Sequence, residues 1–447
     1  MNANLKEAGL SQTLTDKVAL ALEAADAEGA TAAQASASQD AGLSVNVRRG
    51  EVETLEHHKD QGIAITVFVG ECKGSASTAD LRDASIREAA AAACRIAKVS
   101  EPDPCAGLAD AALMATDIPD LDLYHPWQID ADSAIALARD CESVALGMDK
   151  RIVNSEGAEV GSFTGQMAYG NSHGFIGGYA TSRHSLSCSV VAGDAQGMQR
   201  DYWYTAARCA DDLLAAEEIG RQAAERALKR LGGRRLSTRR CPVLFVPETA
   251  RSLLGQFMGA ISGGSLYRRA SFLVDHLGQR VFPEFVRIHE RPHLLRGLGS
   301  APFDAEGVAT ADRDFVNQGV LESYVLSSYA ARRLGMVTTG NAGGVRNLEM
   351  VPGDLDLPAL LREMGTGLML TELIGHGTNM VTGDYSRGAA GFWVENGEIL
   401  YPVEEITVAG NLKQIFAELV AVGKDVDRRG GIHTGSWLVD GLTVAGD

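Results

Sequence analysis

The stretch from Cys241 to Arg269 limits the possible folds of this chain most strongly, because it joins a short apolar strand to a helix with two unlike sides. At about 100° per residue, one side of the helix is continuously apolar. That side holds Ala250, Leu253, Leu254, Phe257, Met258 and Ile261. The other side, called the bare side below, holds Gly255, Gln256, Gly259 and Ala260. Two glycines inside a helix each cost about 1 kcal/mol relative to alanine, so we expect another part of the structure to pack close against the bare side.

The length of 447 residues favours two or three domains rather than one. Composition shifts and breaker residues divide the chain into an N-terminal α+β domain (1–100), a linker or crossing segment (101–130), a middle region of a helix and an antiparallel meander (131–235), and a C-terminal β-rich domain (236–447). The basic segment Lys229–Arg240 surrounds a Gly-Gly pair and lacks interleaved aromatic residues. We interpret it as a domain boundary rather than a nucleic-acid patch.

Periodicity predicts the elements inside these regions. Helices are expected at 13–28, 80–97, 131–148, 211–231 and 357–364, after the strand at Cys241, and in a helical pattern at 415–422. Strands are expected at 32–38, 43–58, 61–77, 151–170, 174–193 and 198–209. The predicted class is α+β, with a mixed or antiparallel N-terminal sheet flanked by helices and a barrel-like C-terminal domain.

Composition excludes several classes of protein. A formal charge of −17 disfavours nonspecific binding of nucleic acid, which depends on Lys and Arg. No window approaches the roughly 18 apolar residues of a membrane helix, and the start lacks the pattern of a signal peptide, so we expect a cytoplasmic protein. The seven cysteines are widely spaced without a CxxC pair, which favours reduced thiols over a disulfide or zinc framework.

The segment from His289 to His293 matches the zinc-peptidase pattern HExxH literally. That motif needs both histidines one helical turn apart, and Pro292 opposes a helix there. We therefore interpret the match as a turn.

His173 and His184 lie in the predicted meander. The adjacent His184 and Ser185 are residue types that act as general base and nucleophile in hydrolases. No oxyanion elbow accompanies them, so structural or substrate-lining roles are favoured.

Longer strings of residues carry a resemblance that spans nearly the whole chain. They are KGSASTADL (73–81), EPDPCAGLAD (101–110), DKRIVNSEG (149–157), GNSHG (170–174), TSRHSLS (181–187), GAISGGSLYRR (259–269), PHLLRGLGSAPFD (292–304), and MGTGLMLTELIG followed by TGDYSRGAAGFWVENGEI. With these strings the chain resembles the TldD/PmbA family, also labelled modulators of DNA gyrase, and in particular its PmbA (TldE) branch.

The resemblance implies a cytoplasmic metallopeptidase complex that trims peptides and degrades unstructured polypeptides. In it, a TldD-type subunit with an HExxxH zinc motif pairs with a PmbA-type subunit. The three HExxxH positions correspond to Gly255, Gln256 and Ala260, and Thr434 stands where the TldD branch has a cysteine. Glycine and alanine offer no metal donor and a glutamine amide is not basic, so we expect this chain to hold no metal or other cofactor.

The favoured hypothesis is a noncatalytic PmbA/TldE-like subunit whose TldD-type partner holds zinc and whose substrate is a peptide or unfolded polypeptide. Tyr267 joins His173, His184 and Thr434 as substrate-lining candidates. We expect a heterodimer in the cell, a homodimer when the chain is expressed alone, no membrane association and no direct binding of nucleic acid.

Two alternatives stay open. One is an autonomous peptidase with an unrecognised site, for which metal or base would come from His173, His184, His289, His293 and His433. The other is a regulator that binds DNA gyrase.

Overall fold

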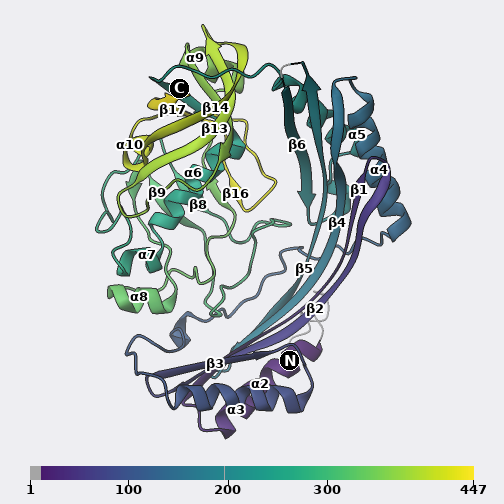
Figure 1. The fold of residues 1–447 in the computed structure, drawn as a ribbon. Coiled ribbons are helices and arrows are strands. Elements are labelled where there is room, and N and C mark those ends of the chain that lie inside the picture. The colour runs from purple at the N-terminus through teal and green to yellow at the C-terminus, as the bar shows by residue number, and fades with distance from the viewer. Residues whose placement is uncertain (1–11, 196, 447) are drawn as a thin grey trace.

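A long curved sheet and a β-barrel domain make up the protein, whose computed structural model describes residues 12–195 and 197–446 (Figure 1). The sheet lies along one side, with helices on its outer face, and the C-terminal domain occupies its hollow (Figure 1). The structure confirms the predicted α+β class, with an antiparallel N-terminal sheet and a barrel in the C-terminal domain.

The curved sheet has six antiparallel strands in the order β3-β2-β1-β4-β5-β6. Its strands are β1 (Ala32–Arg48), β2 (Glu51–Val69), β3 (Cys72–Thr78), β4 (Ile152–Asn171), β5 (Ile176–Asp194) and β6 (Gly197–Ala207). Its helices are α2 (Gln12–Ala27), α3 (Asp83–Ala97), α4 (Ala131–Gly147) and α5 (Ala216–Lys229), and the short 3₁₀ helices η1 (Ala111–Leu113) and η2 (Ala210–Asp212) lie in the connections. Because β1 pairs with β4, the first and middle regions share one sheet, and the domain boundaries stay a prediction.

Small residues let the helices lie close to the sheet. The alanine-rich α3 covers β3 at Gly74, where an added Cβ would lie 2.1 Å from the carbonyl oxygen of Ala93. A second apolar cluster lies under α4 and α5, including the buried thiols of Cys141 and Cys188. Helix α4 begins at an N-cap, since the Asp130 carboxylate accepts a hydrogen bond from the Ser133 N–H (2.8 Å).

The C-terminal domain is built on two sheets. Its helices are α6 (Pro247–Ala260), α7 (Gly263–Tyr267), α8 (Ser328–Leu334), α9 (Leu357–Met364) and α10 (Leu412–Ala417). The strands of the larger sheet, in the order β14-β13-β12-β7-β17-β15, are β7 (Arg239–Phe245), β12 (Gly367–Ile374), β13 (Asp384–Glu395), β14 (Glu398–Asn411), β15 (Leu419–Val422) and β17 (Trp437–Ala445). Pairing of β14 with β17 closes five of these strands into a barrel.

The smaller sheet has the order β10-β9-β8-β11-β16. Its strands are β8 (Ile288–Glu290), β9 (Arg313–Asn317), β10 (Val320–Leu321), β11 (Leu348–Met350) and β16 (Ile432–His433). One sequence prediction in this domain was wrong. The helical pattern at 415–422 is only half helix, because α10 ends at Ala417 and β15 then pairs with β17.

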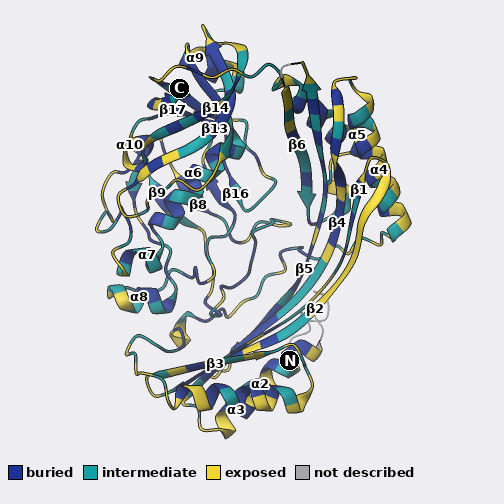
Figure 2. Cartoon of the chain, in the orientation of Figure 1, coloured by how far each residue is buried: buried dark blue, intermediate teal, exposed yellow. Residues whose placement is uncertain are grey.

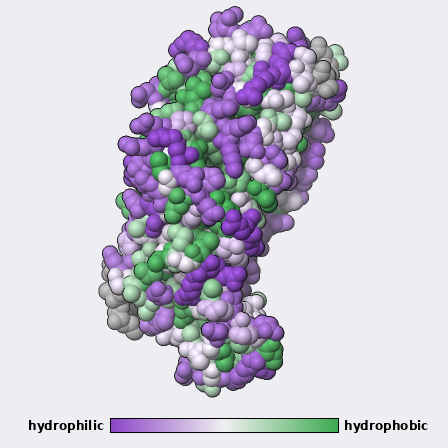
Figure 3. Space-filling model, turned by 90° about the vertical axis from the view of Figure 1, so that its left-hand side faces the viewer, coloured by the Kyte–Doolittle hydropathy of each residue, from purple (hydrophilic) through white to green (hydrophobic). Residues whose placement is uncertain are grey.

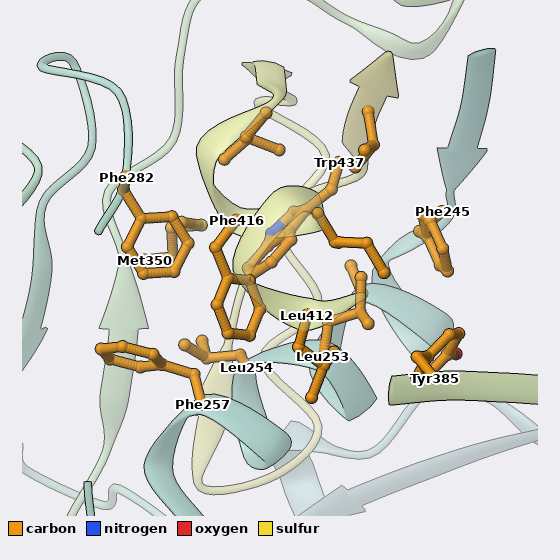
Figure 4. Close-up of a cluster of buried hydrophobic side chains, with 14 of the residues drawn as sticks. Phe245, Leu253, Leu254, Phe257, Phe282, Met350, Tyr385, Leu412, Phe416 and Trp437 are labelled. Atoms are coloured by element: carbon orange, nitrogen blue, oxygen red, sulfur yellow. The ribbon is translucent and has the colours of Figure 1, made fainter. Parts of the chain in front are cut away.

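The apolar side of α6 lies in the core of this domain. Leu253, Leu254 and Phe257 face an aromatic cluster, and the ring of Phe257 lies 5.1 Å from that of Phe282 and 5.6 Å from that of Phe416 (Figure 4). These edge-on contacts are the favourable geometry for aromatic pairs. Burying this side is what holds α6 in place despite its glycines.

The surface of the molecule is mostly polar on the side shown in Figure 3, where apolar side chains occur in separate groups among hydrophilic ones. Within residues 12–195 and 197–446, no helix is long and apolar enough to cross a membrane.

Candidate functional site

The bare side of α6 is not uniform in the structure. A Cβ added to Gly255 would meet no atom within 4 Å, and one added to Gly259 would lie 3.6 Å from Met380, an ordinary contact. Ala260 is fully buried, and its carbonyl oxygen accepts a hydrogen bond from the Ser271 hydroxyl (2.6 Å). The expectation of close packing along the whole bare side was therefore wrong at Gly255, which faces open space.

A cleft of about 830 Å³ lies beside the first turn of α6, between the curved sheet and the barrel. The helix contributes Val246, Pro247 and Glu248. A smaller adjoining pocket of about 270 Å³ reaches Thr249 and Ser252. Because residues three and four apart share one face of a helix, Glu248, Ser252 and Gly255 lie on one stripe that runs from the cleft onto the bare side.

The walls of the cleft combine apolar side chains with charged ones. The apolar lining is Trp203, Leu214, Val246, Pro247, Leu357, Met369, Phe392, Ile399, Leu400, Tyr401, Pro402 and Val426. Ile399 and Leu400 are about half exposed, at 47% and 50%. A volume and lining of this kind are typical of sites that take small molecules or a few side chains of a larger ligand.

Arginine–carboxylate pairs form the polar wall of the cleft and join its two sides. Arg429, on the segment before β16, stacks on Trp203 (3.9 Å to the ring centroid) and Tyr204 (4.5 Å) of β6. Its guanidinium also pairs with Asp427 (2.9 Å) and with Glu248 of α6 (3.5 Å). Such stacking and bidentate pairing suit arginine specifically.

Two arginines at the C-terminal end of α5 add further ion pairs. The ion pairs of Arg226, Arg230, Arg251 and Arg429 with their carboxylates are called the arginine network below. Arg226 pairs with Asp201 (3.0 Å) and Glu248 (3.3 Å), and Arg230 pairs with Asp201 (3.5 Å) and Glu372 of β12 (2.5 Å). The network therefore ties β6 and α5 to the barrel domain, and it fixes both the width of the cleft and the position of the first turn of α6.

Asp427 shows how closely charge is compensated in the network. Burial alone would raise the pKa of Asp427, but hydrogen bonds from Arg429 and the charges of Arg429 and Arg251 outweigh it and hold this pKa below its usual value. Arg251 of α6 lies 3.1 Å from the Asp427 carboxylate. The Asp427 carboxylate is therefore ionised near neutral pH, and its pair with Arg251 holds the segment before β16 against α6.

The three residues that the family resemblance aligns with HExxxH do not fit a zinc ion. Gly255 and Ala260 carry no donor atom, and Gln256 carries an amide. In the described part of the chain, no group of three or more His, Cys, Asp or Glu side chains is arranged to hold a metal.

The literal HExxH segment does not form a helix, since His289 and Glu290 belong to strand β8. Asn341 donates two hydrogen bonds (2.9 Å each) to the buried Glu290 carboxylate.

The four substrate-lining candidates do not line this cleft, and each has partners of its own. His184 is buried, and it shares a hydrogen bond with Ser162 (3.0 Å) rather than with Ser185. Burial lowers its pKa. His173 is exposed at the β4–β5 turn, where its Nε2 lies 3.1 Å from the Ala109 carbonyl oxygen.

The other two candidates lie in the C-terminal domain. Tyr267 ends α7 and contacts the ring of Tyr329 (5.9 Å). Thr434 is buried, and its hydroxyl accepts a hydrogen bond from the Trp437 indole (2.7 Å). The sequence analysis did not predict the arginine network. The segments DYWY (201–204) and DVDRRGG (425–431) carry about half of its residues, and their combination of charged with aromatic or glycine residues was the available signal.

Comparison with known proteins identifies the class of protein that this fold represents. Sequence models of the PmbA/TldA metallopeptidase match domain 1 at residues 33–97, the central domain at 124–231 and the C-terminal domain at 238–446. The chain belongs to this family.

Individual relatives agree with that assignment. A metalloprotease PmbA homolog of Haemophilus influenzae is 48% identical over 437 residues, which cover 98% of this chain and 97% of the relative. The crystal structure of a proposed modulator of DNA gyrase from Bacteroides thetaiotaomicron is similar with a TM-score of 0.92 and 27% identity, and it covers 98% of this chain and 100% of its own. TldE of Thermococcus kodakarensis shares the fold, with a TM-score of 0.79, 17% identity, and coverage of 96% and 100%.

Proposed function

We propose that this chain is a noncatalytic PmbA/TldE-type subunit that binds peptide substrates and works with a zinc-bearing TldD-type subunit in the cytoplasm. One observation supports the proposal. Helix α6, which the resemblance aligns with the metal-motif helix of the TldD branch, has a packed apolar side, while Gly255, Gln256 and Ala260 supply neither zinc ligands nor a general base.

The cleft beside α6 is the proposed peptide-binding surface. Its apolar lining suits the side chains of an extended or unfolded polypeptide, and the half-exposed Ile399 and Leu400 offer apolar area that binding would bury. The arginine network keeps the walls apart in a fixed geometry, which lowers the entropic cost of binding. The bare stripe at Gly255 leaves room for a chain to continue along α6.

The deciding experiment measures peptide cleavage and zinc content for this chain alone, for a TldD-type partner alone, and for the two after co-expression. We expect cleavage and stoichiometric zinc only where the partner is present, and higher activity in the co-purified complex than in the partner alone. Full activity of this chain by itself would refute the proposal. A partner that is equally active with and without this chain would refute the joint role.

A cleft variant separates peptide binding from assembly. Leu400→Lys should raise the KM of the complex about tenfold, because an apolar side chain that the substrate would cover becomes charged. Val337→Lys is the matched control, since Val337 is 65% exposed and lies outside the cleft. Equal KM values for the two variants would show that the cleft does not bind the peptide.

A further inference from the structure

A small pocket beside α6 contains an arginine that has no carboxylate partner. This pocket of about 270 Å³ adjoins the cleft, and Arg387 of β13 and Ser252 of α6 are part of its lining. Strand β13 is buried through its middle and more exposed at its ends (Figure 2), and Arg387 is half-buried near its start. Its Nη1 donates a hydrogen bond to the Ser252 hydroxyl oxygen (3.0 Å). Its Nε is buried without a hydrogen-bond partner among the described residues.

The carboxylates around this pocket are already paired with other arginines. The pairs join the carboxylates of Glu156, Asp201, Glu248, Glu372 and Asp427 to the guanidinium groups of Arg200, Arg226, Arg230, Arg251 and Arg429. Within residues 12–195 and 197–446, no carboxylate forms an ion pair with Arg387. Its charge is therefore not balanced by a direct partner in this part of the chain.

The phenol of Tyr385 does not supply the missing negative charge. Tyr385 lies on the same face of β13 as Arg387, because residues two apart in a strand point the same way. Burial raises the pKa of the Tyr385 hydroxyl to about 12, and the charge of Arg387 offsets only part of this rise. The phenol is therefore neutral near neutral pH.

Ser252 adds a hydrogen-bond donor at the same place. Its hydroxyl oxygen accepts the bond from Arg387, and no acceptor in the described part of the chain takes its hydroxyl proton. A guanidinium beside a hydroxyl can bind an oxyanion, because charged hydrogen bonds to carboxylate or phosphate are short and strong. Ser252 also lies on the stripe of α6 that runs from Glu248 in the cleft wall to the open space at Gly255.

The pocket and the cleft border on each other. Asp201, Arg226, Arg230, Glu248 and Thr371 line both of them. A ligand that fills the apolar cleft can therefore place one end in the pocket. An inorganic phosphate would satisfy the same two donors, but it gives no reason for the apolar lining next to them. A peptide does, since it carries apolar side chains and ends in a carboxylate.

We propose that Arg387 and Ser252 bind the C-terminal carboxylate of a peptide whose side chains occupy the cleft. This inference rests on the peptide-binding role proposed above, and it adds a rule for the substrate. The cleft then selects peptides by a free carboxyl end and not only by apolar side chains. It also fixes the direction of the bound peptide, whose last residue lies at Ser252.

A pair of peptides that differ only at the carboxyl end tests the proposal on the full chain. The probe is an acetylated pentapeptide of leucine and alanine, made once as the free acid and once as the C-terminal amide. Isothermal titration calorimetry near pH 7 should give a dissociation constant about tenfold or more lower for the free acid, because the amide cannot form the charged hydrogen bonds. Arg387→Gln should abolish this preference by weakening the free acid to the level of the amide.

Two further variants support the comparison. Ser252→Ala should lower the preference for the free acid about threefold, since it removes one donor and keeps the guanidinium. Arg280→Gln is the matched control, because it removes the same charge from an exposed position of the C-terminal domain outside the cleft and the pocket. It should keep the full preference. Circular dichroism verifies that each variant is folded.

The outcomes separate this subsite from the cleft itself. A wild type that binds acid and amide equally, or an Arg387→Gln variant that keeps the preference, would overturn the subsite and leave the cleft as a peptide-binding surface. Failure of both peptides to bind would refute the cleft, and the subsite with it. Tight binding of inorganic phosphate alone, or an amidated peptide ending in glutamate that matches the free acid, would assign the pocket to another oxyanion and overturn the proposal.

Discussion

Gly255 offers a direct test of whether the bare side of α6 serves packing. It lies inside a helix, its φ is not in the left-handed region, and an added Cβ would meet no atom within 4 Å. Alanine is better than glycine in a helix interior by about 1 kcal/mol. Gly255→Ala should therefore raise the free energy of unfolding by about 1 kcal/mol, which is about 2–4 °C in Tm for a domain of about 200 residues.

Gly220 of α5 is the matched control, because the same gain in helix propensity meets an obstacle there. A Cβ on Gly220 would lie 2.3 Å from the carbonyl oxygen of Cys141 in α4, so the two helices would have to separate. Overpacking of this kind costs about 1–3 kcal/mol. Thermal unfolding followed by circular dichroism compares both variants with the wild type. A loss of stability in Gly255→Ala, or equal shifts in both variants, would refute the reasoning.

Two further predictions concern buried charge. Arg429→Ala should lower the free energy of unfolding by about 3 kcal/mol in urea titrations, because it removes a main partner of the buried Asp427, whereas Arg95→Ala, whose ion pair with Glu88 is exposed on both sides (63% and 71%), should change it by less than about 1 kcal/mol. Similar losses in both would contradict the prediction. Burial raises the pKa of Asp304 to about 6, above its unfolded-state value of about 4, so the folded state binds more protons between these pH values and the free energy of unfolding should fall as pH rises from about 4 to about 6. Asp304→Asn should flatten that slope, and an unchanged slope would show that another group causes it.

The sequence predicts local elements well where one face is buried. The amphipathic pattern of α6 and the alternation in β4 to β6 both appear in the structure as expected. The pattern at 415–422 misleads because its apolar residues fit a helix as well as a strand. Pairing of Leu419–Val422 with β17 decides the outcome, and no local pattern contains that information.

Contacts between distant segments were beyond the reach of the sequence. Ser185 follows His184 in the chain, but neighbours in a strand point to opposite faces, and the register places Ser162 opposite His184 instead. The sequence did not predict the arginine network for the same reason. Trp203 and Arg429 are far apart in sequence, and only the docking of the barrel domain against β6 brings the guanidinium onto the ring.

The glycines of α6 now need a different explanation from the one their sequence suggests. A glycine that weakens a helix is normally retained for a left-handed φ or for close packing, and neither applies to Gly255. The remaining explanation for a glycine at this position is the open space beside Gly255. That space lies on the stripe that starts at Glu248 in the wall of the cleft, and the core contacts of Phe257 help to hold the helix there. A helix that is held by its apolar side and open on the other leaves room for a polypeptide beside it, as the proposed substrate-binding role requires.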